Sequence, residues 1–127
     1  MKLLCTAFFL LFFTSSFAQE LACDRFKTGK FLMEDPNTGK NYITRTATTQ
    51  IEDVPDLGIK VELNIRWEDE CTFVLTLKKV LENTSGREVG DFELISKITE
   101  TGEDYFLVSS RIEGMDLIMD RKFVVLE

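Results

Sequence analysis

The residues of this chain that could do chemistry are few, and its cysteines come first. The sequence contains three, Cys5, Cys23 and Cys71, and it contains no histidine. Without histidine, the common general bases and the Ser/His or Cys/His nucleophile systems are missing, and no zinc or copper ligand set can be assembled. Paired carboxylates stay open because acids are plentiful, but none falls in a motif. We therefore predict no catalytic residue, no metal site and no cofactor, and we do not expect an enzyme.

Cys23 and Cys71 are predicted to form a disulfide. Cys5 lies in an N-terminal segment that we expect to be removed, which leaves these two in the remaining chain. Two cysteines in an exported domain of this size usually pair, because the compartment is oxidising. The alternative is a pair of buried free thiols.

Two arginines and the single tryptophan are the candidate ligand-binding residues: Arg45, Trp67 and Arg111. Arg45 lies on the same face of an alternating segment as Ile43, and Gln50 lies on the other face. If the strands close into a barrel, as the pattern described below predicts, the Arg45 guanidinium could point into its lumen and hold a carboxylate. Arg111 invites the same argument, and Trp67 could stack on a ligand at a barrel mouth. The alternatives are structural: an ion pair or a solvated end for the arginines, and a Trp67 that seals the barrel end over the disulfide.

The N-terminal segment, residues 1–18, is predicted to be a cleaved signal peptide and not part of the fold. Lys2 supplies a positive start, an apolar run follows over residues 3–13, and the small residues Ser16 and Ala18 stand where signal peptidase requires them. The run is too short to span a bilayer comfortably, so no membrane span is expected. Cleavage would release a protein that is secreted or periplasmic.

Lipid anchoring through Cys23 is a competing interpretation of the same region, and it is less favoured. Glu20 puts a charge where an acylation motif has an aliphatic residue, and the apolar run has already ended by that point.

The charge balance excludes one class of partner. The chain has 15 basic and 22 acidic residues, a formal net charge of −7. Phosphate backbones require a basic surface, so nucleic acid is not an expected partner. The acids are scattered along the chain, which indicates a well-solvated surface.

Alternation of apolar and polar residues with a period of two predicts that residues 19–127 form a single all-β domain. The pattern is clearest where Val61, Leu63, Ile65 and Trp67 alternate with polar residues. Strand-forming residues dominate the runs, and short turn signals separate them. We expect strands over residues 26–33, 41–51, 59–67, 71–81, 90–100, 104–112 and 115–126.

Seven or eight consecutive antiparallel strands form an up-and-down meander, and its two edges need protection. The last segment, residues 115–126, is apolar on both faces and should therefore be covered. Closure onto the first strand is the simplest cover and gives a small closed barrel. A two-sheet sandwich or a dimer contact would also cover it.

Several short segments stand along the chain in a recognisable order: residues 26–31 (FKTGKF), 43–45 (ITR), 50–52 (QIE), 65–67 (IRW) and 70–75 (ECTFVL). In these segments the chain is similar to the small secreted lipocalin-like (calycin-type) proteins of the Bacteroidetes, and the resemblance implies a small lipocalin-like barrel. Some members of that group carry a DNA topoisomerase IV label, which a chain of this length and charge does not support. The group lends no activity to individual residues.

These observations predict a non-catalytic exported binding module that holds a small apolar ligand in the barrel lumen. The alternative is a solid-cored structural or protein-interaction domain of the cell envelope, because aromatic side chains on the strands could fill a barrel of this size. The expected partner is accordingly a small hydrophobic ligand or an envelope protein.

Overall fold

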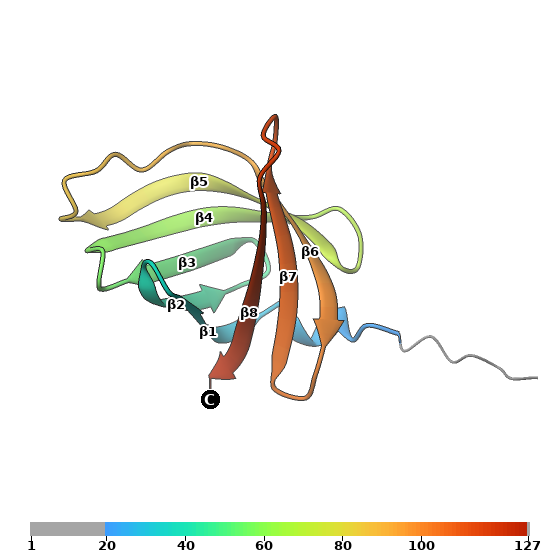
Figure 1. The fold of residues 1–127 in the computed structure, drawn as a ribbon. Coiled ribbons are helices and arrows are strands. Elements are labelled where there is room, and N and C mark those ends of the chain that lie inside the picture. The colour runs from blue at the N-terminus through green and yellow to red at the C-terminus, as the bar shows by residue number, and fades with distance from the viewer. Residues whose placement is uncertain (1–19, 127) are drawn as a thin grey trace, which may run out of the picture.

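A computed structural model describes residues 20–126, and these form an eight-stranded closed barrel (Figure 1). Each strand pairs antiparallel with the next, and the last pairs with the first, which confirms the predicted all-β up-and-down barrel. A 3-10 helix, η1 (Cys23–Phe26), precedes the first strand. The predicted signal peptide lies outside the described residues. The strands are β1 (Gly29–Asp35), β2 (Gly39–Arg45), β3 (Thr49–Val54), β4 (Ile59–Trp67), β5 (Thr72–Asn83), β6 (Leu94–Thr101), β7 (Tyr105–Ile112) and β8 (Ile118–Leu126).

The barrel closes where β8 meets β1, with residues 30–33 opposite residues 123–126. Phe123 turns inward and is buried. The outer face of β8 differs from the prediction, because Ile118 is 66% exposed and Val124 is 36% exposed. Closure satisfies the backbone edges of a sheet but covers only its inner face. The predicted closure is therefore confirmed, while the premise that both apolar faces are covered is wrong.

One predicted strand, residues 41–51, is two strands separated by a tight turn at residues 46–48. The Oγ1 of Thr46 accepts hydrogen bonds from the backbone N–H groups of Thr48 (3.4 Å) and Thr49 (3.0 Å), and the Thr46 N–H donates to the Thr49 carbonyl at 2.9 Å. Threonine side chains can replace a sheet partner for the backbone in this way. The turn breaks the alternation, so residues on β3 face differently from what a continuous strand predicts.

The two ends of the barrel differ. Because the strands alternate in direction, η1 and the turns at residues 46–48, 68–71 and 102–104 lie at one end, which we call the closed end. The connections at residues 36–38, 55–58, 84–93 and 113–117 lie at the other, the open end. In Figure 1 the longest of them, residues 84–93, arches above β5 on its way to β6.

The closed end is filled by aromatic side chains. Phe26 of η1 packs on Phe106 with ring centroids 4.7 Å apart, and Phe106 stacks on Phe123 at 4.9 Å. Phe31 meets Phe106 edge-on at 5.1 Å, and Phe73 is also fully buried. Large rings in such pairs bury much apolar area and hold η1 against this end of the barrel. We call η1, which closes this end, the plug.

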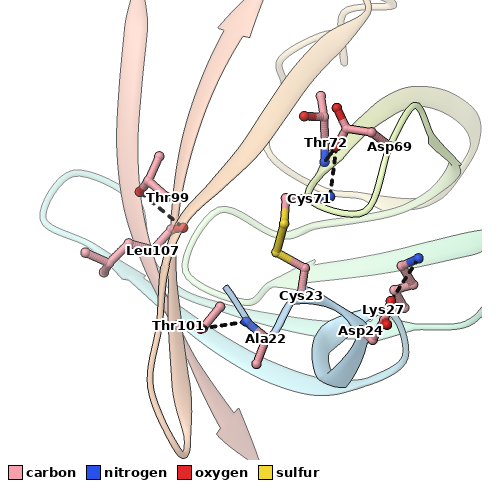
Figure 2. The surroundings of a disulfide bond; sticks show 10 residues. All are labelled: Ala22, Cys23, Asp24, Lys27, Asp69, Cys71, Thr72, Thr99, Thr101 and Leu107. Atoms are coloured by element: carbon pink, nitrogen blue, oxygen red, sulfur yellow. Dashed lines mark hydrogen bonds and ion pairs between the residues drawn. A yellow bond between two sulfur atoms is a disulfide. The ribbon is translucent and has the colours of Figure 1, made fainter. Parts of the chain in front are cut away.

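The predicted disulfide between Cys23 and Cys71 is confirmed, with Cα atoms 5.3 Å apart. It joins η1 to the turn before β5 (Figure 2). Nearby, the N–H of Ala22 donates to Thr101 Oγ1 at 3.0 Å, and Asp69 Oδ1 accepts from the N–H of Cys71 and of Thr72. The bridge uses the Cys23 sulfur, which lipid attachment would require.

Such a disulfide is typical of an extracytoplasmic domain. Within residues 20–126 the sole helix is the four-residue η1, far shorter than a bilayer-spanning helix.

Candidate functional site

The candidate site is the open half of the lumen, where two adjoining cavities remain. The first, of about 270 Å³, lies among β3, β4, β5 and the 84–93 connection. The second, of about 180 Å³, lies among β1, β6, β7 and β8. Glu52, Leu75 and Leu94 line both, so the two cavities meet at these residues.

The cavities remain at the open end because the side chains that point into the lumen are smaller there than at the closed end. Near the closed end they are phenylalanines, whereas β6 and β7 contribute Ser96 and Ser110 near the second cavity. The two hydroxyl oxygens lie 2.7 Å apart, so one hydroxyl donates a hydrogen bond to the other. Small side chains at facing positions leave a lumen of this size partly empty.

A polar stripe runs down the inner face of β2 and β3. Arg45 lies opposite Gln50, and Ile43 lies opposite Glu52, so all four side chains project inward. Asn41 lies two residues before Ile43 on β2, on the same inner face, and its Nδ2 donates to Glu52 Oε1 at 2.9 Å. Asn41 is 5% exposed, and its Oδ1 accepts no hydrogen bond from any described residue.

Burial raises the pKa of the Glu52 carboxyl above its usual value, while the Asn41 hydrogen bond and the positive charge of Arg45 oppose the shift. Glu52 is the one carboxylate that lines both cavities. A group of this kind accepts hydrogen bonds in a mostly apolar enclosure, where each such bond is stronger than in water.

Arg45 points inward and is 3% exposed. This orientation is the one that the ligand-binding interpretation of the sequence required. The Nη1 of Arg45 donates to the Phe26 carbonyl at 2.8 Å and its Nε to Gln50 Oε1 at 2.8 Å. Burial lowers its pKa to about 10, partly offset by the negative charge of Glu52, so it remains a cation near neutrality. It lies at the aromatic closed end and lines neither cavity.

Aromatic rings surround this guanidinium. Its central carbon lies 4.6 Å from the Phe73 ring centroid and 5.2 Å from that of Phe31. The rings of Phe106 and Trp67 follow at 5.6 Å and 5.9 Å. Cation–π attraction of this kind is strongest when the cation is desolvated. The arrangement has the form of a structural anchor, and a ligand role for Arg45 stays a prediction.

Trp67 and Arg111 lie apart from the cavities. Trp67 is partly buried against the core beside Cys71, with its ring 4.9 Å from that of Phe73, and Lys27 Nζ lies 5.2 Å from its centroid. Arg111 is exposed on the outside of β7, 3.6 Å from Glu113. An inward Arg111 is therefore wrong, because its strand presents Ser110 to the lumen instead.

The sequence pattern did not identify Asn41 or Glu52 as candidate site residues. A continuous strand over residues 41–51 places Gln50 on the face opposite Arg45 and therefore turns Glu52 away from it as well. The Thr46 turn reverses that assignment. The threonine-rich run at residues 44–49 was the available signal, since threonines can bond to the backbone and form a turn.

At the open end of β1, Arg121 Nη2 lies 2.8 Å from Asp35 Oδ2 beside the second cavity. The N–H of Asn37, which donates to Asp35, lowers the pKa of that carboxyl, and Arg121 lowers it further. The pair balances its own charge at the rim. No group of three His, Cys, Asp or Glu in the described chain is arranged to hold a metal ion.

No protein-family model matches the chain, and neither a curated protein nor a solved structure matches it.

Proposed function

We propose that this protein is an exported, non-catalytic binding module that takes a small, largely apolar ligand into the open half of a lipocalin-like barrel. One observation carries the proposal. The core packs the closed end with phenylalanine rings yet leaves two adjoining cavities, of about 270 and 180 Å³, at the other end.

The lining favours an apolar ligand. Aliphatic residues of β4 and β5 are the largest group lining the first cavity, and Phe92 of the 84–93 connection contributes to it while being 49% exposed. Binding sites for small molecules have mainly apolar walls with a few placed polar groups. Each cavity alone is somewhat smaller than the roughly 300 Å³ at which such sites usually begin, so the ligand is small or reaches through both.

The closed end makes the site rigid. The disulfide ties η1 to the β4–β5 turn, and the Arg45 bonds tie η1 to β2 and β3. A site on rigid elements holds its shape before the ligand arrives, which lowers the cost of binding.

Binding of the neutral apolar fluorophore N-phenyl-1-naphthylamine tests this function. We expect the protein to enhance its fluorescence saturably. Val61→Phe should weaken binding at least about tenfold, because Val61 is 7% exposed and its side chain lines the first cavity. Circular dichroism would verify that the variant folds.

Val124→Phe is the matched control, since it makes the same change on the outer face of β8. It should leave binding unchanged. A wild-type protein that does not bind the fluorophore, or equal loss in both variants, would contradict a ligand site in the lumen.

A second candidate, contact with an envelope protein, is supported by the open rim. Phe92, Met115 and Leu117 are about half exposed on two connections that the Glu113 N–H to Glu93 carbonyl bond joins. Exposed apolar groups gathered in this way are typical of interaction surfaces. Loss of pull-down of a specific envelope protein by Met115→Ser, with fluorophore binding intact, would favour this candidate.

A further inference from the structure

We propose that the lumen selects an amphiphile whose head group donates hydrogen bonds, an alkyl alcohol or an alkyl ammonium, with the donor placed between Glu52 and Asn41. The inference rests on the proposed function and specifies the ligand class of the same site.

The two hydrogen-bond acceptors, Asn41 and Glu52, come from the neighbouring strands β2 and β3. Asn41 Nδ2 donates to Glu52 Oε1, which fixes the amide with its nitrogen toward the carboxylate and leaves Oδ1 as the remaining atom. Within residues 20–126, the buried Oδ1 of Asn41 has no donor, and the hydrogen bond from Asn41 Nδ2 engages only the Oε1 oxygen of Glu52. Both residues line the first cavity. A buried acceptor without a donor is unfavourable, so a ligand that brings a donor there offsets that cost.

The same geometry disfavours an acceptor-only head group. A carboxylate placed beside an ionised Glu52 would set two anions together in a mostly apolar enclosure. An ammonium would form a charge-assisted bond to Glu52, and a hydroxyl would donate to one acceptor and still accept from water.

The two arginines that point into the lumen, Arg45 and Arg121, do not provide a binding site for a ligand carboxylate. Arg45 donates to Phe26 and Gln50 from Nη1 and Nε. Its Nη2 is buried without a partner in the described chain, but Arg45 lines neither cavity, so a ligand in the cavities does not meet it. Arg121 lines the second cavity but is paired with Asp35. A carboxylate ligand, which the sequence suggested for Arg45, therefore finds no arginine free at the cavities.

The tail of the ligand has its own place. Beyond Glu52 the first cavity is walled by aliphatic side chains of β4 and β5, which suit an unbranched alkyl chain. Val61, Leu63, Leu75 and Leu77 supply this wall.

Displacement of N-phenyl-1-naphthylamine from the full mature chain by three ligands of one chain length tests the inference at pH 7. The ligands are 1-octylamine, 1-octanol and sodium octanoate. We expect octylamine and octanol each to displace the fluorophore at concentrations at least about tenfold below octanoate. Octylamine ahead of octanol would identify an ionised Glu52 as the main recognition element, and equal potency would identify hydrogen-bond donation alone.

Two variants locate the effect. Glu52→Gln replaces the carboxyl group with an uncharged amide that donates as well as accepts, so the preference over octanoate should fall to less than about threefold. Asn41→Leu removes both amide atoms and should weaken octanol without weakening the fluorophore to the same extent. Glu82→Gln and Asn64→Leu make the same changes at exposed positions and should leave the preference intact. If Asn41→Leu does not fold, Glu52→Gln alone decides.

The outcomes separate this inference from the proposed function. Octanoate equal to or better than the other two ligands overturns the head-group assignment, as does an unchanged preference in Glu52→Gln. In either case, saturable fluorophore binding that Val61→Phe weakens would leave the proposed function standing. Absence of fluorophore binding would remove both.

Discussion

Arg45 shows how a single buried charge can organise one end of a small barrel. Its guanidinium links three elements: η1 through the Phe26 carbonyl, β3 through Gln50, and β2, which carries it. Burial penalises the charge, as the lowered pKa of about 10 shows, and the rings and the two acceptors compensate.

Arg45→Met should destabilise the protein by about 2 kcal/mol, although methionine fits the volume. The substitution removes a desolvated charge but leaves the Phe26 carbonyl and Gln50 Oε1 without a donor, at about 1–3 kcal/mol for each buried group. Urea unfolding followed by Trp67 fluorescence measures the change.

Arg111→Met is the control for this substitution. Arg111 is exposed on β7, so its loss should shift stability by no more than about 0.5 kcal/mol. If Arg45→Met were as stable as the wild type, the anchoring role would have to be abandoned.

At the scale of elements, two short pieces determine the site: the turn at residues 46–48 and the plug η1. The turn ends β2 after Arg45 and restarts the alternation so that Gln50 and Glu52 face the lumen. The plug brings Phe26 and Cys23 under the barrel, and the disulfide holds it there.

Replacing both cysteines, Cys23→Ser with Cys71→Ser, should lower the free energy of unfolding by up to about 4 kcal/mol. The bridge closes a loop of sequence separation 48, and the cost is mainly the entropy regained by the unfolded chain. Thermal unfolding of the oxidised protein and of the double variant measures this change.

Reductant provides the internal control. It should lower the Tm of the wild type toward that of the double variant and leave the double variant unchanged. Full thiol labelling of the native wild type without reductant would show that the bridge does not form.

At the scale of the whole molecule, the barrel is held unevenly around its circumference. The β5–β6, β1–β8 and β2–β3 pairings each have four residue pairs, while the β4–β5 pairing has nine. Beyond Leu75 the long β5 has no β6 partner among the described residues, and its residues 78–83 are exposed while the 84–93 connection runs above the strand (Figure 1). The turn at residues 46–48 joins β2 directly to β3, whereas no tight turn joins β5 to β6 or β1 to β8. The β5–β6 and β1–β8 seams are therefore the places where the barrel opens most readily.

Native-state hydrogen exchange should show this difference directly. Amides that bridge β5 to β6 and β1 to β8 are expected to exchange at least about tenfold faster than those at the centre of the β4–β5 pairing, because local opening breaks fewer hydrogen bonds. Uniform protection around the barrel would mean that it opens only as a unit. The β4–β5 amides serve as the reference within the same sample.

The amino-acid sequence by itself determined the strand-rich character, the inward positions of most apolar residues and the Cys23–Cys71 pairing. These properties follow from a two-residue repeat and from the number of cysteines, which are local or countable features. Only the tertiary structure decided that β8 meets β1 with its outer face exposed, that Glu52 faces the lumen, and that the open half stays partly empty. Each of these depends on how distant strands divide a shared volume, and one turn at Thr46 changes the faces that follow it.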